Sequence, residues 1–303
     1  MSVTNWLLKD KKIKTSVYHL GRYCGSWKAS TYPKGLPSFH FLLGGDCWLD
    51  IGGKERIFLT SGSIVFFFKN IPFHLISSEK ECVDNLEYRQ MQEINSSDEG
   101  TALLCGFMRP ESTGSKVLFS LLPEFIIVND DEASSSKLHL LFELLKKECG
   151  LKNEQNEEII SHLSEAILYY LISHHIQETD IDLALLNVSE DVLFSELIIN
   201  ILDKPGEKWS LEEMASKVFM SRSTFIRKVM KLTGYTPNFM LSKLRINKAI
   251  CLLRRGGTIE EIYSEIGYES LTGFHRAFKR ITGKTPNEYA EKFLRINKEY
   301  INS

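Results

Sequence analysis

Short apolar runs alternate with turn residues through the first third of the chain. The runs are Phe39–Leu43, Cys47–Ile51 and Ile64–Phe68, and the turn signals are Gly44-Gly45, Gly52-Gly53, Ser61-Gly62 and Ile71-Pro72. Several short strands at this spacing are typical of a β-sandwich or a small β-barrel, which we expect over about residues 15–130. Both faces of Gly62–Phe68 are apolar, so we expect this strand to be buried on both sides.

The apolar positions follow a helical period after residue 137. One stripe consists of Leu138, Leu141, Phe142 and Leu145, and a second of Ile160, Leu163, Ile167, Tyr170, Leu171 and His174. The stripes predict two amphipathic helices over about 137–177, which either pack on the barrel or pair with a second copy of the chain. We therefore expect a first domain over residues 1–178, and an acidic linker over 179–193.

A short unit occurs twice in the expected second domain, residues 194–303. Segments 210–240 and 258–289 match at an offset of 48 in their first halves and of 49 in their second halves. Each copy begins with a capping box, Ser210 with Glu213 and Thr258 with Glu261. The copies predict two helix-turn-helix units, at about 210–235 and 258–284, joined by a long helix over 237–255.

Charge is distributed unevenly between the two expected domains. Residues 1–190 contain 18 basic and 26 acidic side chains, whereas residues 191–303 contain 19 basic and 13 acidic ones. From Met214 to Ile259 there are ten Lys or Arg and no Asp or Glu. A basic face on a repeated helical unit indicates double-stranded DNA as the partner, with the second helix of each unit in the major groove.

Helical spacing separates an inner from an outer face in each of these second helices. The inner stripes are Phe225, Val229 and Leu232 in the first copy, and Phe274, Phe278 and Ile281 in the second. The outer positions that we expect to face bases are Arg222, Ser223, Ile226 and Arg227, then Leu271, Thr272, His275 and Arg276. Arginine matches two acceptors of guanine at once. Contacts to phosphates, which position the protein on the duplex, are expected from Lys231, Lys279, Arg280 and Lys284.

Residues 195–295 resemble the DNA-binding domain of the AraC/XylS family of bacterial transcription regulators. The resemblance rests on MSRSTFIRKVMKLTGYTP, LSKLRINKAICLL, IGYES, FHRAFKRITGKTP and NEYAEKF. It implies that the two units read adjacent major-groove segments about 10 bp apart through the eight outer residues, and that RNA polymerase is a partner. Tyr263 stands where the family usually has Ala, and Gly273 lies inside the second recognition helix. We therefore expect the first copy to contribute more to specificity.

About residues 17–130 resemble the cupin-like effector domain found in a subset of this family. The resemblance rests on SFHFLLGGDCWLDIGG, FLTSGSIVFFFKNIPFHLI, LLCGFMRP and LLPEFIIV. It implies a small effector inside the barrel, or pairing of subunits. The expected pocket is apolar, and its expected lining residues, which could equally be plain core, are Trp27, His40, Trp48, Phe66, Phe68 and His74. Two histidines without a carboxylate make a poor metal site, so we expect no metal and no cofactor.

The expected fold class is α+β, with a cupin-like β-barrel and appended helices followed by an all-α domain of two helix-turn-helix units joined by a long helix. The expected function is sequence-specific regulation of transcription by a cytoplasmic protein that is not an enzyme. We expect its barrel to control DNA binding through a small effector, through formation of a homodimer, or through both. Two alternatives stay open: a metal-dependent cupin enzyme with an accessory nucleic-acid-binding domain, and a regulator that uses its barrel only for dimerisation. The six cysteines lack metal-site spacing, which favours reduced thiols. No segment is apolar enough for a signal peptide or a membrane span.

Overall fold

The computed structural model divides the chain into two compact units. The sheet unit comprises residues 1–110 and 123–174, and the helical unit comprises residues 111–122 and 175–303. Within these ranges the structure describes residues 13–291 except 33, 53–55, 81–82, 84–85, 89–91, 93–99, 130–136, 151–155, 179–182, 189–190 and 255.

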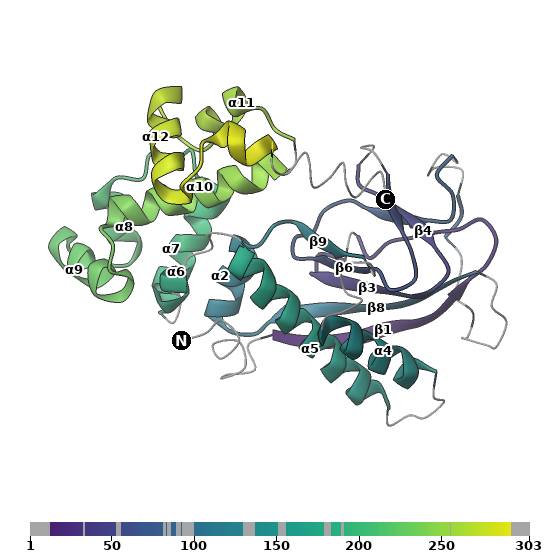
Figure 1. The fold of residues 1–303 in the computed structure, drawn as a ribbon. Helices are drawn as coiled ribbons and strands as arrows, with labels where there is room; N and C mark the ends of the chain where they lie inside the picture. Colours follow the sequence, from purple (N-terminus) through teal and green to yellow (C-terminus); the bar gives the residue numbers. More distant parts are fainter. Residues whose placement is uncertain are drawn as a thin grey trace. The chain divides into compact units, whose positions relative to one another are not determined.

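Antiparallel strands form two sheets in the described part of the sheet unit (Figure 1). The five-stranded sheet has the order β1-β8-β3-β6-β9, and the four-stranded sheet has the order β2-β7-β4-β5. The strands are β1 (Ile13–Tyr23), β2 (Lys28–Ala29), β3 (Ser38–Gly44), β4 (Cys47–Asp50), β5 (Ile57–Leu59), β6 (Ile64–Phe67), β7 (His74–Ile76), β8 (Thr101–Pro110) and β9 (Phe125–Val128). Gly45 makes the tight turn between β3 and β4 with φ 73°. A Cβ atom there would lie 2.5 Å from the Gly100 carbonyl oxygen.

The apolar core of the sheet unit contains residues from both sheets. Leu42 and Leu103 of the five-stranded sheet pack with Leu49, Leu59 and Leu75 of the four-stranded sheet. This arrangement follows from the period of two in a strand, which sends alternate side chains to the same face.

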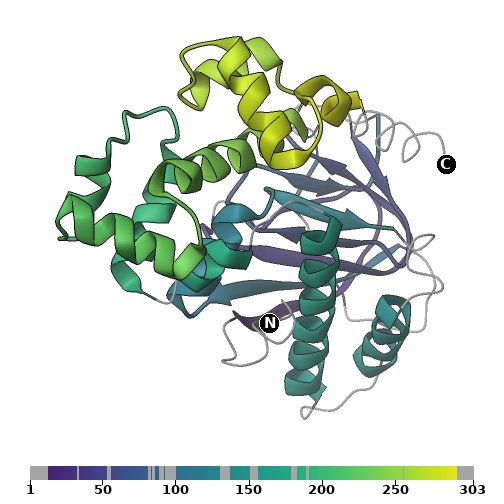
Figure 2. The same cartoon turned by 60° about the vertical axis from the view of Figure 1, so that its left-hand side comes forward.

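Two helices cover the other face of the five-stranded sheet (Figures 1 and 2). They are α4 (Lys137–Cys149) and α5 (Asn156–Glu178). The ring of Phe41 on β3 meets Phe142 of α4 at 6.3 Å between centroids. The Ser161 hydroxyl of α5 donates to the Thr15 carbonyl of β1 at 2.8 Å. The sequence left open whether these helices pack on the barrel or pair with a second copy of the chain, and in the structure they pack on the sheet.

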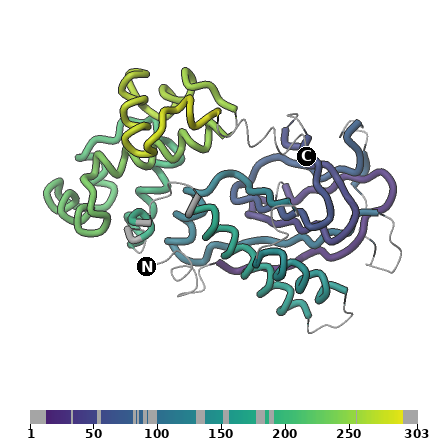
Figure 3. Tube along the Cα trace, viewed as in Figure 1, coloured from purple at the N-terminus to yellow at the C-terminus, as the bar shows by residue number. Residues whose placement is uncertain are grey.

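The helical unit is built around its longest helix, α10 (Pro237–Arg254). The other helices described in this unit are α2 (Thr113–Leu121), α6 (Leu183–Val188), α7 (Val192–Asp203), α8 (Leu211–Lys217), α9 (Arg222–Thr233), α11 (Ile259–Glu265) and α12 (Leu271–Thr282). Figure 3 follows the chain from α8 and α9 through α10 to α11 and α12. α10 contacts α7 and α9 as well as α11 and α12, so one rigid element joins the two helix-turn-helix units.

Helix α2 lies between two strands in the sequence but belongs to the helical unit. The chain leaves the sheet unit after Pro110 and returns to it at Pro123. In between, α2 packs against α6 and α7, and it buries Val117, Leu118 and Phe119. The expected barrel of about residues 15–130 therefore differs from the observed sheet unit by this helix.

The α+β class is confirmed, with antiparallel sheets followed by a helical region. The segment expected as a linker, 179–193, contains α6, and α7 begins within it at Val192. Residues 179–182 and 189–190 of that segment, and Arg255 at the end of the expected joining helix, lie outside the described residues.

Candidate nucleic-acid interface and sheet-unit cavity

The first helix-turn-helix unit consists of α8, a short turn and α9. The Ser210 hydroxyl accepts from the Glu213 N–H at 3.1 Å, and a Glu213 carboxylate oxygen accepts from the Ser210 N–H at 2.8 Å. The bond from that backbone N–H is the main reason why the pKa of Glu213 is lowered. Ser221 caps α9, and Gly234 ends it in the left-handed conformation at φ 75°. These local bonds fix where α9 begins and ends.

Helix α9 buries one face and exposes the other. Phe225, Val229 and Thr233 are buried, and the Phe225 ring stacks on Phe194 of α7 at 5.8 Å. Leu232, which the sequence placed on the inner face, is only half-buried. Helical periodicity thus identified the buried face of α9, although Thr233 and not its neighbour Leu232 is the third buried residue.

The residues expected to face bases in the first copy lie on the opposite side of α9 from this buried face. Arg222, Ser223 and Arg227 are exposed, and Ile226 is half-buried. Met230 continues this side one turn later and is 48% exposed. The outer face of α9 is therefore a mixed surface with two guanidinium groups and two apolar side chains.

The second unit repeats this construction with α11 and α12. Thr258 and Glu261 form its capping box, Ser270 caps α12, and Gly283 ends α12 at φ 75°. The buried residues of α12 are Phe274, Ala277 and Phe278, whereas Ile281 is half-buried.

The outer residues expected in the second copy are arranged much as in the first. Leu271, Thr272 and Arg276 are exposed, and His275 is half-buried with its ring at the edge of Phe274. Both recognition helices thus present an exposed arginine at the equivalent position, Arg227 in α9 and Arg276 in α12.

Two residues of the second unit depart from the family pattern, and the structure accommodates both. Tyr263 is half-buried and packs against the core formed by α10, α11 and α12. Gly273 lies in the first turn of α12, where its N–H donates to the Ser270 hydroxyl at 3.2 Å. A glycine at a helix end costs less than one in the helix interior because fewer helical bonds depend on it.

The arginines of the outer face differ in their ion pairs. Arg222 pairs with Glu212 of α8 at 2.9 Å, with both side chains more than half exposed. An exposed pair of this kind is worth roughly 0–1 kcal/mol, so it does not prevent Arg222 from turning to another partner. Within the described ranges, Arg227 and Arg276 have no ion pair. The sequence did not indicate the Glu212 contact, because it depends on how α8 and α9 cross.

Lys228 is occupied within the helical unit. Its ammonium lies 2.6 Å from an Asp191 carboxylate oxygen and 4.9 Å from the centre of the Phe194 ring. Asp191 also caps α7. The hydrogen bond from Lys228 is the largest cause of the lowered pKa of Asp191. A basic residue next to Arg227 in the sequence therefore serves the packing of α7 and α9.

The four residues expected to contact phosphates, namely Lys231, Lys279, Arg280 and Lys284, are all exposed. Arg280 also lies over the ring of Phe239 on α10, with 5.0 Å from its guanidinium carbon to the ring centre. Both helix-turn-helix units contribute exposed cations, so both could contact phosphates of one DNA duplex.

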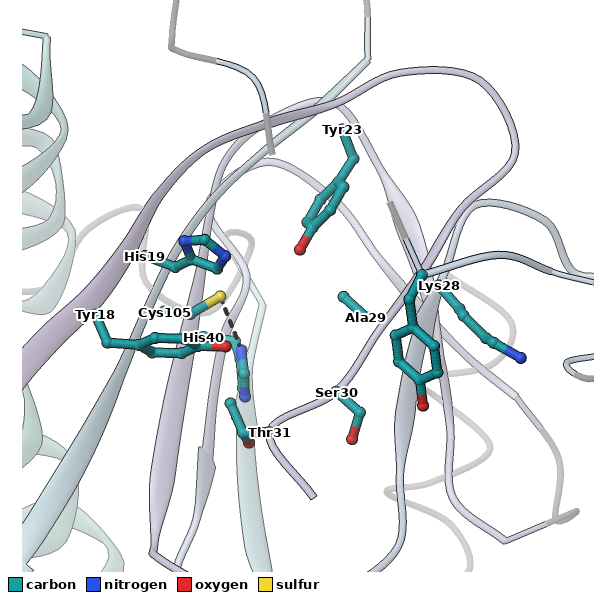
Figure 4. A pocket seen from close by; sticks show the side chains of 10 residues that line it. Tyr18, His19, Tyr23, Lys28, Ala29, Ser30, Thr31, His40 and Cys105 are labelled. Atoms are coloured by element: carbon teal, nitrogen blue, oxygen red, sulfur yellow. Dashed lines mark hydrogen bonds between the residues drawn. The ribbon is translucent and has the colours of Figure 1, made fainter. Parts of the chain in front are cut away.

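A cavity of about 170 Å³ opens in the sheet unit, and ten residues line it (Figure 4). The lining includes Tyr18, His19 and Tyr23 of β1, His40 of β3 and Cys105 of β8. His40 is 2% exposed, and its Nδ1 lies 3.1 Å from the Cys105 sulfur (Figure 4). Its Nε2 lies 3.4 Å from the Ser38 hydroxyl.

Burial favours the neutral forms of four ionisable groups that line this cavity. Burial lowers the pKa of His40 to about 3 and raises the pKa of Cys105 to about 12. Burial also raises the pKa of Tyr23 and lowers that of His19, with a further lowering by Lys34. The Cys105 thiol is therefore unreactive, and these four residues offer neutral hydrogen-bonding groups beside the Lys28 side chain.

Of the six expected pocket residues, His40 alone is among those that line this cavity. Trp27 stacks on Tyr23 within the core, and Trp48 packs against Phe58. Phe66 contacts the rings of Phe39 and Phe41. Most residues that line this cavity have polar groups, with Ala29 and aromatic rings among them, whereas the expected lining was apolar.

Phe66 and Phe68 are buried, which agrees with the plain core that the sequence left open as the alternative to a pocket lining. The ring of Phe66 meets those of Phe39, Phe41 and Phe68, whereas Phe67 belongs to the core between the sheets. Both faces of β6 are apolar, so alternation along the strand could not tell which aromatic side chains point toward the interior.

His74 has a separate environment from that of His40. Its Nε2 lies 3.2 Å from the Tyr88 hydroxyl, and it is not among the residues that line the cavity. Among the described residues, no group of three or more His, Cys, Asp or Glu side chains is arranged to hold a metal ion.

Two families match this chain, one over each part. Residues 5–177, more than half of the chain, match the family described as Cupin, and residues 214–292 match the helix-turn-helix domain family. An HTH-type transcriptional regulator of Haemophilus influenzae is 27% identical over 274 residues, which is 88% of this chain and 90% of that protein. The chain belongs to the AraC/XylS family.

Another relative of this AraC/XylS regulator is an AraC-like transcription regulator of Streptomyces lividans. It is 24% identical over 88% of this chain and 90% of its own length. Among solved structures, ToxT from Vibrio cholerae matches with a TM-score of 0.35 and 14% identity, over 93% of this chain and 98% of its own. The expected function is confirmed at this level: the chain is a DNA-binding transcription regulator with a cupin-like effector domain.

None of the helices in the described segments is both long and apolar enough to cross a bilayer.

Proposed function

We propose that this AraC/XylS regulator reads DNA through the outer faces of α9 and α12. The proposed base contacts are the eight outer residues Arg222, Ser223, Ile226, Arg227, Leu271, Thr272, His275 and Arg276. The proposed phosphate contacts are Lys231, Lys279, Arg280 and Lys284. The observation that carries this proposal is the equivalent placement of Arg227 and Arg276, which are exposed and without an ion pair among the described residues.

The physical basis is the geometry of the guanidinium group. An arginine fork donates to O6 and N7 of one guanine, and each good bidentate contact discriminates by about 1–3 kcal/mol against a wrong base. An arginine held in an internal salt bridge would have to break that pair first. No described residue offers Arg227 or Arg276 such a salt bridge. The capped ends of α9 and α12 hold both helices in place.

The test compares Arg227→Ala with Arg276→Ala in the full chain. A high-affinity duplex is first selected from a random pool, and binding is then measured by fluorescence anisotropy at several salt concentrations. We expect both variants to bind more weakly, and Arg227→Ala to lose more. The control is Lys146→Ala, which removes an exposed cation of α4 in the sheet unit. Equal losses would contradict the leading role of the first copy, and no loss in either variant would refute the base contacts.

We further propose that the cavity of the sheet unit binds the effector. The hydroxyls of Tyr18 and Tyr23 and the His19 ring have no hydrogen-bond partner among the described residues, although the Tyr23 side chain is almost completely buried. Polar groups that line a cavity without a protein partner can bond to a ligand there, so these groups support a ligand with matching donors and acceptors. A cavity of about 150 Å³ holds benzene. The observed volume of about 170 Å³ thus suits a small molecule that carries hydrogen-bonding groups.

Tyr23→Phe tests the proposed effector site because it removes one hydroxyl and keeps the ring. Compounds are first screened by thermal shift on the full chain, and each hit is then titrated against the variant. We expect the affinity of a genuine effector to fall in Tyr23→Phe and to stay unchanged in Tyr170→Phe, which alters an exposed tyrosine of α5. A compound with the same affinity for Tyr23→Phe and for Tyr170→Phe would show that the effector binds outside this cavity.

Pairing of two chains is the remaining part of the proposal. Leu140 and Leu144 lie four residues apart on α4, and they are 70% and 46% exposed. Side chains at this spacing share one helix face, so a second copy could cover them. Leu140→Asp should shift the sedimentation of a dimer toward the monomer.

We also propose contact with RNA polymerase, a cytoplasmic location and the absence of enzyme activity, because the named relatives are regulators.

A further inference from the structure

One residue of the first helix-turn-helix unit has an unusual backbone conformation and an unusual exposure. Phe219 lies in the turn between α8 and α9 at φ 54°, and it is the one residue other than glycine with a positive φ in the described part of the chain. Its side chain is 85% exposed. A bulky residue in the left-handed region is strained, and an exposed aromatic ring gains nothing from burial.

The second unit contains the same turn with a glycine. Gly267 corresponds to Phe219 at the offset of 48 and has φ 82°. The N–H of Phe219 donates to the Ser216 carbonyl at 3.0 Å, and the N–H of Gly267 donates to the Ser264 carbonyl at 3.0 Å. Both turns therefore require the conformation that glycine adopts most easily, and only the first contains a residue that adopts it at a cost.

The surroundings disfavour a side chain in the second turn. A Cβ atom at Gly267 would lie 2.6 Å from an Arg245 guanidinium nitrogen and 3.0 Å from the Gly206 Cα atom. At Phe219 the side chain is almost fully open to solvent. The strain at Phe219 therefore contributes nothing to internal packing, and strain that packing does not explain is concentrated at functional sites.

The location of Phe219 points to DNA as the partner. Phe219 is three residues from Arg222, so their Cα atoms are at most about 10 Å apart. The first residues of a recognition helix contact base edges, and the major groove is about 12 Å wide. A side chain at this position thus reaches the rim of the groove, where deoxyribose rings and thymine methyl groups offer apolar surface.

The charge around Phe219 favours the same partner. Phe219 lies within the stretch from Met214 to Ile259 that has ten basic and no acidic residues. Lys217 and Arg222 flank it and are both exposed, and Arg222 makes an exposed ion pair with Glu212 that is easily exchanged for a phosphate. A basic surface around an apolar side chain suits a polyanion that also has apolar groups.

We propose that Phe219 is a DNA-contact residue that packs its ring on the apolar rim of the groove read by α9. This contact rests on the proposed reading of DNA by α9, and it adds an apolar contact that the second unit lacks. It increases the share of binding that comes from the first unit. It also explains why a strained aromatic residue stands where glycine would be easier.

The test uses three substitutions of Phe219 in the full chain. Asn tolerates the left-handed conformation and removes the ring, Gly removes both strain and side chain, and Tyr keeps the ring. Phe219→Asn should bind the selected duplex about 5- to 20-fold more weakly while its Tm stays equal or rises. Phe219→Gly should bind with a similar loss, and Phe219→Tyr should bind within about two-fold of the original chain.

Three outcomes would overturn the proposal. Binding by Phe219→Asn within about two-fold of the original would exclude the contact. A fall in Tm together with affinity would make Phe219 a structural residue, and a loss of transcription with unchanged DNA affinity would assign it to a protein partner. Duplexes with deoxyuridine in place of thymidine separate a methyl contact from a sugar contact. Arg227→Ala measured on the same duplexes shows whether the reading by α9 itself has failed.

Discussion

Arg227 and Lys228 are adjacent in the sequence, and we expect their alanine variants to fail in different ways. Arg227 is exposed on the outer face of α9, whereas the Lys228 ammonium lies 2.6 Å from Asp191 and is about one-third exposed. Arg227→Ala should weaken operator binding by about 1–3 kcal/mol, and it should relax the preference for one base pair. Lys228→Ala should leave affinity and its salt dependence nearly unchanged.

Lys228→Ala should instead lower the free energy of unfolding of the helical unit. A partly exposed ion pair contributes about 0.5–1 kcal/mol after screening by solvent, and the contact with the Phe194 ring adds roughly 0.5–1 kcal/mol. Loss of both should lower the Tm of the helical unit by about 3–8 °C. A double-mutant cycle with Asp191→Asn isolates the pair, because Asn still caps α7.

Two measurements decide between these roles. Fluorescence anisotropy at several salt concentrations gives the number of cations that contact phosphate, and calorimetry of the full chain gives the Tm of each unit. The reasoning is refuted if Lys228→Ala lowers the salt slope as much as Lys231→Ala does, or if Arg227→Ala lowers Tm but leaves affinity unchanged.

Three further predictions concern stability. Lys228 lowers the pKa of Asp191. The ion pair should therefore stabilise the helical unit above about pH 4, and this stabilisation should be lost as the pH falls through the folded-state pKa of Asp191. When Tm is measured from about pH 3 to 6, the Tm of Asp191→Asn should depend less on pH than that of the original chain. Leu118→Ala should destabilise the helical unit by about 2–5 kcal/mol, because Leu118 of α2 is completely buried there, and hydrogen exchange of α7 should report it. Gly234→Ala and Gly283→Ala should each cost roughly 1 kcal/mol in urea unfolding, because both glycines end a helix at φ 75°; a much larger cost in one copy would contradict this.

The features that the sequence predicted well depend on residues close together in the chain. The capping boxes at Ser210 and Thr258 formed as expected, because each needs residues only three positions apart. The repeat also placed Arg227 and Arg276 on equivalent exposed faces, since helical periodicity alone decides which face contains the buried phenylalanines.

The features that the sequence did not predict depend on contacts between distant residues. Lys228 could not be paired with Asp191 from spacing, because α7 and α9 meet only in the folded helical unit. The pocket was expected to be apolar because small-molecule sites usually are, and the sequence offered several aromatic residues for its lining. Two of these aromatic residues, Phe66 of β6 and Phe68 just after it, stack on each other and are not part of the core cluster that contains Phe67. The positive φ of Phe219 could not be predicted, because the pattern of apolar positions carries no information about the backbone conformation of a single turn residue.

The insertion of α2 has a consequence for synthesis of the chain. The segment Thr113–Leu121 leaves the ribosome about seventy residues before α7, the helix against which it packs. Its apolar side chains, including Val117 and Phe119, are then without their final neighbours while translation continues. A nascent chain at this stage presents a binding site for chaperones. Expression of the carboxyl-terminal half alone would leave the matching surface of α7 bare, so that co-expression of a peptide spanning residues 111–122 should improve its yield.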